Sequence, residues 1–346
     1  VLLLAWPARR LGLVDHPSTR KHHRQPVPLV GGLAIWATFT LGILLKPDQL
    51  PDNRYLLGGM TLMTLVGLLD DFRPVNHWVR FLLQVLAILV MGLADDTVLN
   101  NLGDLLGTGD ILFTRMAWAF TLFAVVGMIN AFNMIDGLDG LAGGQALIAT
   151  GWLVLLSLHA PILIPARVES LLVFAASITG FLLFNIRHPW RAHASVFMGD
   201  AGSTLLGYVL AWFMIRMTQD EGLELNPITA VWIMAFPLMD TLAVMVRRML
   251  AGCSPFAADR QHLHFLLLAF GLSDGRVVAI LLILAFGLGG FGVLTQWYGV
   301  PEYVRFYSFV SLFLLYVAIT MRMARVIRAR LVVGADRRHL SASESS

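Results

Sequence analysis

The sequence contains little charge and only one cysteine. Charged residues make up 14% of the 346 positions, hydrophobic residues make up 57%, and the mean hydropathy is +0.73. These values lie far from those of soluble globular domains and indicate a chain that resides mostly in a bilayer. The single cysteine, Cys253, excludes an intramolecular disulfide, and no metal ligands accompany it in the sequence.

Other absences narrow the class of function. The sequence has neither a Walker P-loop nor a kinase glycine-rich loop, so ATP is not indicated as a substrate. Basic and aromatic residues are not interleaved, so no nucleic-acid partner is expected although the isoelectric point is about 9.3. The sequence shows no repeat of fixed period and no linker that could hold a soluble domain. We therefore predict one integral membrane domain over 1–321, followed by a basic, partly disordered cytoplasmic tail over 322–346.

Ten apolar segments are long enough to cross a bilayer. They lie near 30–46, 55–69, 80–94, 113–132, 140–158, 168–186, 203–217, 228–246, 276–297 and 303–321. A shorter apolar stretch at 1–6 is expected to be the remnant of a truncated first helix. The predicted fold is an all-α polytopic membrane protein with ten complete transmembrane helices, part of an eleventh, and cytoplasmic loops that form the active site.

The distribution of cations predicts the orientation. Nineteen of the 25 Lys and Arg residues fall on one set of connections, as do nine of the ten histidines. These connections are the loops at 7–29, 70–79, 133–139, 187–202 and 247–275, with the cations that adjoin them, and the tail after 321. The positive-inside rule makes this side cytoplasmic. The expected location is the cytoplasmic (inner) membrane of a bacterium, in contact with bilayer lipids, with the chemistry facing the cytoplasm.

The most informative motif is an acidic stretch between two apolar runs. It contains Asn130, Asn133, Asp136 and Asp139 and ends in a glycine pair at 143–144. An ionised aspartate near the lipid core costs several kcal/mol unless it faces a partner or water. The stretch therefore indicates a functional site, and the alternative is a glycine-rich turn whose aspartates are merely solvated.

Two further motifs place carboxylates at helix ends. Asp70 and Asp71 are adjacent and repel each other, which favours a divalent ion between them that also touches phosphate. The alternative is a solvated helix end in which Arg73 pairs with the acids. Asp200 lies between glycines just before an apolar helix, where it could bind a metal or only cap the helix. Phe197, three residues earlier, could stack on a base.

A basic loop precedes the first complete predicted helix. Its Lys21 and neighbouring cations could meet a phosphate, with Gly31 and Gly32 allowing close approach of the backbone. The alternative is unspecific binding of anionic lipid head groups.

The last predicted cytoplasmic loop carries a second basic group. Asp240 lies about two turns before an arginine pair, at a depth where an acid needs a partner. Arg260, His262 and His264 could ligate a metal, hold a phosphate or act as general acids. Zinc is disfavoured, since no third soft ligand lies nearby in the sequence.

Acids that hold a metal and cations that hold phosphates are the components of phosphoryl transfer. A phosphate-bearing substrate at the bilayer surface suggests that the acceptor is itself a lipid. The rival class is a transporter or lipid flippase, whose ionisable residues would lie near the midplane and across both leaflets. Here the motifs lie at helix ends on one predicted face.

Six segments in the same order resemble the polyprenyl-phosphate N-acetylhexosamine-1-phosphate transferases, especially the bacterial members that use undecaprenyl phosphate and UDP-GlcNAc. They are GLVDHPSTRKHHRQPVPLVGG, GLLDD, NAFNMIDGLDGLAGG, FMGDAGS, PLMDTLAVMVRR and SPFAADRQHLH. The resemblance covers about residues 12–278. Many members continue the last motif as HxHH, whereas Phe265 stands here, which leaves the sugar open. A second branch of the family, the phospho-MurNAc-pentapeptide transferases, carries a different histidine-rich run, so the DRQHLH segment argues against that branch.

The resemblance implies eleven transmembrane helices and a reaction between a UDP-N-acetylhexosamine and undecaprenyl phosphate that releases UMP. It implies Mg²⁺, with Mn²⁺ able to substitute, and it allows a homodimer. The implied metal ligands are Asp200 and Asp71. The implied catalytic residues are Asp70, Asp71, Asp136 and Asp139. The expected substrate-binding residues are Lys21, Asn130, Asn133, Phe197, Asp240, Arg260, His262 and His264. The product would initiate synthesis of O-antigen or a related envelope polysaccharide.

Overall fold

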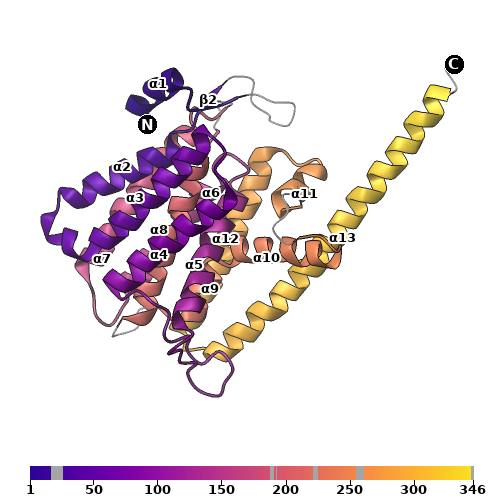
Figure 1. The fold of residues 1–346 in the computed structure, drawn as a ribbon. Coiled ribbons are helices and arrows are strands. Elements are labelled where there is room, and N and C mark those ends of the chain that lie inside the picture. The colour runs from indigo at the N-terminus through magenta and orange to yellow at the C-terminus, as the bar shows by residue number, and fades with distance from the viewer. Residues whose placement is uncertain (17–25, 188–190, 192, 221–224, 255–260, 344–346) are drawn as a thin grey trace.

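The computed structural model describes the chain except for residues 17–25, 188–190, 192, 221–224, 255–260 and 344–346. Nearly all described elements are helices (Figure 1). The helices are α1 (Leu2–Leu11), α2 (Gly31–Leu44), α3 (Leu50–Phe72), α4 (His77–Asp95), α5 (Ala117–Ile135), α6 (Leu141–Leu158), α7 (Pro165–Asn185), α8 (Gly199–Gln219), α9 (Pro227–Ile233), α10 (Ala235–Leu250), α11 (Leu263–Ala269), α12 (Asp274–Trp297) and α13 (Glu302–Ser343), with a 3-10 turn, η1, at Pro47–Gln49. Two short strands, β1 (Val14–Asp15) and β2 (Val27–Pro28), pair antiparallel.

Every predicted apolar segment coincides with a helix or with the α9–α10 pair. Within the described part of the chain, six helices are long and apolar enough to span a membrane, or seven if the bent α9–α10 pair counts as one span. Helices α2 and α4 are shorter apolar helices, and α8 is not among the six. The structure confirms an all-α polytopic membrane protein, with one small strand pair that the sequence did not indicate. The count of ten complete spans stays a prediction.

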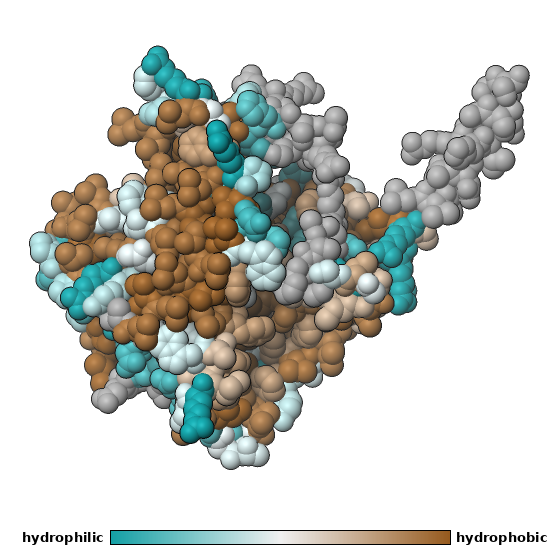
Figure 2. Space-filling view, viewed as in Figure 1, coloured by the Kyte–Doolittle hydropathy of each residue, from teal (hydrophilic) through white to brown (hydrophobic). Residues whose placement is uncertain are grey.

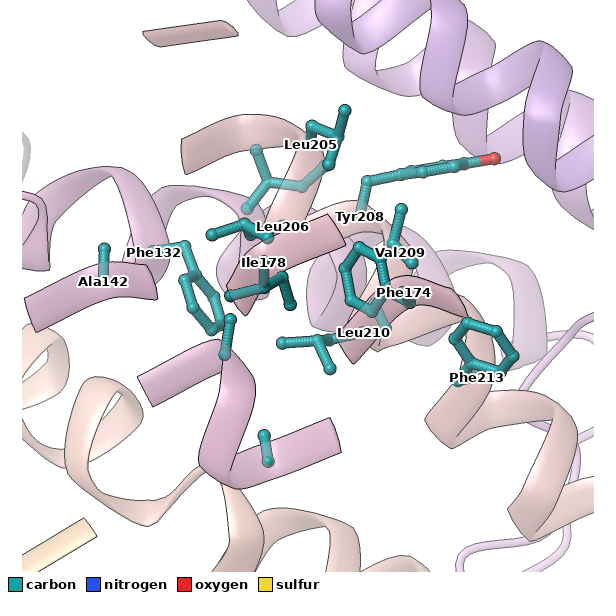
Figure 3. Close-up of a cluster of buried hydrophobic side chains, with 14 of the residues drawn as sticks. Phe132, Ala142, Phe174, Ile178, Leu205, Leu206, Tyr208, Val209, Leu210 and Phe213 are labelled. Atoms are coloured by element: carbon teal, nitrogen blue, oxygen red, sulfur yellow. The ribbon is translucent and has the colours of Figure 1, made fainter. Parts of the chain in front are cut away.

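Helix α8 forms the centre of the bundle. Every residue from Ala201 to Ile215 is buried, since α8 is apolar on all sides and packs against α2, α3 and α5. Figure 3 shows Leu205, Leu206 and Phe213 of α8 beside Phe132 of α5 and Phe174 of α7.

Glycines bring the N-terminal end of α8 close to its neighbours. A Cβ on Gly32 of α2 would lie 2.2 Å from the backbone N of Gly202. A Cβ on Gly67 of α3 would lie 2.3 Å from the Cα of Ala201. Both distances are shorter than any carbon can tolerate, so these helices meet backbone to backbone and hold the start of α8 firmly in place.

The predicted continuous segment at 228–246 is two helices, α9 and α10, that meet at 79°. Pro237 has no N–H to donate to the carbonyl of Ile233 four residues earlier. The buried side chain of Gln145 on α6 donates to that carbonyl instead, over 3.4 Å. The break is therefore compensated by the neighbouring helix, and it redirects α10 across the bundle.

The flank of the bundle is apolar. Large side chains such as Leu65, Leu82, Phe123 and Leu314 are more than half exposed, and Figure 2 shows broad apolar surface between polar ends. Only 6% of the apolar stretch of α13 is buried, and this helix projects from the bundle in Figure 1. Because α13 continues to Ser343, no helix end marks the predicted domain boundary near 321. The domain division itself stays a prediction.

Candidate active site

The predicted motifs meet at one end of the bundle. The C-terminal ends of α3 and α5 lie there with the N-terminal end of α8, and α10 and α11 lie alongside (Figure 1). We call Asp70, Asp71, Asp136 and Asp200 the acid cluster. Lys21 and Arg260, which were predicted to bind substrate, lie outside the described residues.

Asp71 caps the central helix. Its Oδ1 accepts a hydrogen bond from the backbone N–H of Asp200 at 2.8 Å, and its Oδ2 accepts one from Ala201 at 3.3 Å. A carboxylate at a helix N-terminus satisfies free N–H groups and complements the helix dipole. Gly199 has φ +73°, and a Cβ there would lie 2.4 Å from the Asp71 carboxylate, which explains the glycine before Asp200.

Arg80 links two members of the acid cluster. Its Nη1 donates to Asp70 Oδ2 at 2.5 Å and to Asp200 Oδ2 at 3.4 Å. Asp70 also accepts from the backbone N–H of Val75 at 2.6 Å. We predicted Arg73 as the alternative partner of the acid pair, but in the described part of the chain the cation that pairs with Asp70 is Arg80, which lies one turn into α4. Its position nine residues after Asp71, at the start of the next apolar segment, is the one sequence signal that could have identified it.

The two asparagines of α5 have different environments. Asn133 donates to Asp200 Oδ1 at 2.8 Å and to the hydroxyl of Ser203 at 3.0 Å, so it orients Asp200. Asn130 donates to the carbonyl of Val126 in its own helix at 2.7 Å. The structure therefore connects Asn133 to the acid cluster, whereas the side-chain N–H of Asn130 is used within α5.

Asp136 follows the last residue of α5 and is partly buried. Burial, and then the charges of Asp200, Asp71 and Asp139, raise its pKa to about 8. At neutral pH, Asp136 is therefore mostly protonated, because a further negative charge beside the other carboxylates is unfavourable. A bound cation would lower this pKa and favour the ionised form.

Asp139 faces a cation that we did not predict. Arg187 donates to Asp139 Oδ2 at 2.6 Å and to Asp274 Oδ2 at 2.7 Å, so it joins the acidic loop to the start of α12. Asn185 is a second unpredicted residue. It accepts from the N–H of Gly140 at 2.6 Å and donates to the carbonyl of Val196 at 2.9 Å. No local motif marks either residue.

The backbone N–H groups of Gly31 and Gly32 donate to the segment before Asp200. The N–H of Gly31 donates to the carbonyl of Phe197 at 2.9 Å, and that of Gly32 donates to Met198 at 3.0 Å. These two N–H groups therefore already have partners within the protein, and the contact of the basic loop with a phosphate stays a prediction. The two hydrogen bonds attach the start of α2 to the segment before Asp200, and Phe197 lies partly buried at this junction.

Asp240 and His262 form a buried pair. Asp240 Oδ2 lies 2.8 Å from His262 Nδ1, and Oδ1 accepts from the N–H of Leu263 at 2.9 Å and from the hydroxyl of Tyr316 at 2.8 Å. Asp240 is fully buried. The predicted partner of this acid therefore exists, and it is the loop histidine.

His264 connects the last loop to the acidic loop. Its ring is stacked on His262 at 5.7 Å, and a Cβ on Gly137 would lie 2.5 Å from its Nε2. The side chain is fully buried, and its ring nitrogens have no hydrogen-bond partner in the described part of the chain. Burial lowers its pKa to about 4, so the ring is neutral at physiological pH.

Among the described residues, no group of three or more His, Cys, Asp or Glu side chains has an arrangement that could hold a metal ion. A complete protein cage is therefore not formed there. Mg²⁺ does not require one, because it keeps several waters and usually takes one or two carboxylates together with substrate phosphates. The hard oxygen donors of the acid cluster fit such an ion.

Comparison with known proteins shows extensive similarity. Residues 53–218 match the model of glycosyl transferase family 4. A Yersinia pestis protein named undecaprenyl-phosphate alpha-N-acetylglucosaminyl 1-phosphate transferase is 37% identical over 324 residues, which are 93% of this chain and 87% of the relative. Proteins of the same name are 35% identical in Escherichia coli K12, with the same coverage, and 35% identical in Haemophilus influenzae, over 93% of this chain and 90% of the relative.

Proposed function

This chain belongs to glycosyl transferase family 4 and is a sugar-1-phosphate transferase, and we propose that it transfers N-acetylglucosamine 1-phosphate from UDP-GlcNAc to undecaprenyl phosphate. An oxygen of the lipid phosphate would form a bond to the sugar-bearing phosphorus of the donor. The bond from that phosphorus to the bridging oxygen would break, which releases UMP and leaves undecaprenyl-diphospho-GlcNAc. The names of the relatives support undecaprenyl phosphate as the acceptor and N-acetylglucosamine 1-phosphate as the transferred group.

The observation that carries this proposal is the acid cluster held at one end of an apolar bundle. Phosphoryl transfer depends on positioning and on compensation of charge, with little covalent chemistry by the protein. Asp71 and Asn133 hold Asp200 in place, and Arg80 spans Asp70 and Asp200. The residues are thus arranged by contacts between α3, α4, α5 and α8, which is what a rigid site for a charged reaction requires.

We assign Mg²⁺ to Asp200 and Asp71 within this proposal. When bound, the ion would neutralise the donor diphosphate and stabilise the charge that develops during transfer. The protein residues then have separate tasks. Asn133 orients Asp200, and Arg80 pairs with Asp70. His264 lies beside Gly137 of the acidic loop, and His262 stacks on His264.

The nucleophile requires little activation. The second pKa of a phosphate monoester is about 6, so the lipid phosphate is largely a dianion at neutral pH. Direct in-line attack is therefore favoured over a covalent intermediate on Asp70, Asp136 or Asp139. Asp70 would organise charge or accept the remaining proton.

The distribution of cations also indicates on which side of the membrane the reaction takes place. The cations sort to the end of the bundle that holds the acid cluster, so we place this end at the cytoplasmic face of a bacterial inner membrane. The product would initiate assembly of O-antigen or a related envelope polysaccharide. A different UDP-N-acetyl sugar is the alternative donor within the same reaction.

An assay of UMP release tests the proposal. Protein purified in detergent is mixed with undecaprenyl phosphate, Mg²⁺ and each UDP-sugar of a panel in turn. UMP release is expected with UDP-GlcNAc, and only when the lipid acceptor is present. If UMP is released only with a different UDP-sugar, that sugar is the donor instead of UDP-GlcNAc. A stoichiometric burst of UMP without acceptor would contradict direct attack. If no sugar supports release, a transporter becomes the better interpretation.

A further inference from the structure

Asp240 is the most completely buried acid near the site. It accepts hydrogen bonds from three different parts of the chain: His262 at 2.8 Å, the N–H of Leu263 at 2.9 Å and the hydroxyl of Tyr316 at 2.8 Å. Its exposed fraction is 0%. A buried carboxylate is tolerated only when its oxygens are engaged in this way.

This burial separates Asp240 from the substrates. Both of its oxygens already accept hydrogen bonds from the protein, so the carboxylate has no surface to offer to a sugar or a diphosphate. Direct binding of substrate, which the sequence suggested, would require three native hydrogen bonds to rearrange. An effect of Asp240 on the reaction must therefore pass through a residue that it holds.

His262 is that residue. An ionised carboxylate can only accept hydrogen bonds, so the Nδ1 of His262 must carry the proton in this pair. Nε2, on the opposite edge of the ring, then has a lone pair and can accept a hydrogen bond or a proton. A carboxylate behind a histidine fixes both its tautomer and its orientation, as is common in catalytic and metal sites.

We propose that Asp240 and Tyr316 form a buried positioning pair that holds His262 as the Nδ1–H tautomer, with the Nε2 lone pair available to accept from a sugar hydroxyl or, once it has taken up a proton, to donate to the phosphates of the donor. This inference rests on the proposed function for the identity of the donor. Its geometry is independent of that identity. His262 lies within reach of the acidic loop because its ring stacks on His264, which in turn contacts Gly137.

Tyr316 gives α13 a role in the site. Most residues along the apolar length of this helix are exposed or only half-buried. The hydroxyl of Tyr316 reaches Asp240 on α10, and the same carboxylate binds the first N–H of α11. One acid therefore ties α10, α11 and α13 together behind His262.

Nitrogen-15 NMR of the protein labelled only at histidine tests the tautomer directly. His262→Gln assigns the signals of this ring. In wild type we expect a protonated Nδ1 and an unprotonated Nε2. In Asp240→Asn, the amide can donate to Nδ1, so the Nε2–H tautomer should become populated. In Tyr316→Phe the ring signals should broaden or shift in the same direction, because the carboxylate loses one of its three donors.

Kinetics provide the second readout. Asp240→Asn should lower kcat by about 10- to 100-fold, while KM for UDP-GlcNAc changes less than about 2-fold because Asp240 itself makes no contact with the substrate. Tyr316→Phe should show a smaller decrease of the same kind. Thr241→Val removes a buried hydroxyl on α10 that has no hydrogen-bond partner in the described part of the chain, and Tyr307→Phe removes an exposed hydroxyl on α13. Both controls should match wild type.

Two results would overturn the positioning pair. One is an Asp240→Asn protein whose His262 signals equal those of wild type. The other is a variant with raised KM and unchanged kcat, which would make Asp240 a substrate-binding residue. If Asp240→Asn does not fold, Tyr316→Phe carries the same comparison. A wild type that shows the Nδ1–H tautomer but releases no UMP from any UDP-sugar would refute the proposed function and support the positioning pair.

Discussion

The carboxylates at the site differ in how many of their hydrogen-bond positions are occupied by protein groups. Asp71 is bound to the N-terminus of α8, and Asp139 is paired with Arg187. Among the described residues, the Asp200 carboxylate accepts from Asn133 and, at 3.4 Å, from Arg80, and it also lies against Asp70. Unlike Asp71, it caps no helix and keeps oxygen lone pairs for a ligand.

Asp200→Asn should lower the rate of UMP release by about 100-fold or more, because the neutral amide is a poor ligand for Mg²⁺. The fold should persist, since the Asn carbonyl can still accept from Asn133. The rate is measured with UDP-GlcNAc, undecaprenyl phosphate and Mg²⁺, and wild type treated with EDTA should be equally inactive. Asp274→Asn, which removes an acid that pairs with Arg187 outside the cluster, is the matched control. Full activity of metal-free wild type would contradict the assignment.

His264 should make stability depend on pH. Its folded pKa is about 4, against 6.5 for the ordinary side chain. Between these values the unfolded chain binds the proton and the folded chain does not, so acid favours unfolding. The stabilising contribution is complete above pH 6.5 and falls by about 2 kcal/mol at pH 5.

Thermal unfolding of wild type and His264→Gln at pH 7.5 and pH 5 measures this effect. Wild type should lose more stability on acidification than the variant, which has no group to titrate at this position. His193→Gln removes an exposed histidine and should behave as wild type. Equal losses for wild type and His264→Gln would show that the ring is not held neutral.

At the scale of helices, the site depends on the contact between α3 and α8. Gly67 faces the backbone of Ala201, and Asp71 lies one turn further along α3, where it caps α8. A shift of α3 along or away from α8 would therefore break the cap as well as the packing. The direction of α10 likewise depends on a neighbouring helix. At the break between α9 and α10, Gln145 on α6 donates the hydrogen bond that Pro237 cannot donate.

Gly67→Ala should destabilise the protein by about 1–3 kcal/mol, because the new methyl group overlaps the backbone of α8. Activity should fall as well, since Asp71 and Asp200 would separate. Gly58→Ala on the same helix is the matched control, because a Cβ there meets nothing within 4 Å. That variant should be neutral or up to about 1 kcal/mol more stable. Equal unfolding midpoints for the two variants would show that the α3–α8 contact can relax.

At the scale of the whole molecule, the arrangement defines two opposite ends. The exposed Cys253 follows α10 at the end that holds the acid cluster, and the exposed Asp52 lies in the first turn of α3, more than four helical turns from Asp70. A membrane-impermeant reagent can therefore distinguish the two ends with single cysteines.

We expect a membrane-impermeant thiol reagent to label Cys253 in inverted inner-membrane vesicles and not in intact spheroplasts. Cys253→Ser should abolish the labelling. Adding Asp52→Cys to that variant should reverse the pattern, with labelling in spheroplasts only. Labelling of Cys253 in intact spheroplasts would place the acid cluster on the outer face and would contradict the proposed use of a cytoplasmic UDP-sugar.

The sequence by itself determined the membrane class, the positions of the helices and the grouping of the acidic motifs at one end. Hydropathy, the sorting of cations and motif order are properties of short stretches, so they can be recognised before any contact is known. Asp70, Asp71, Asn133 and Asp200 were recognisable for this reason, and the structure brings them together.

Only the tertiary structure decided which groups those residues bind. Arg80 reaches Asp200 across 120 positions, and Tyr316 reaches Asp240 across 76. Arg187, Asn185 and Gln145 likewise act on segments far away in the chain, and no local pattern distinguishes them from ordinary polar residues. A buried carboxylate or a free carbonyl takes whichever donor the packing of helices brings near it, and that packing depends on all the helices together.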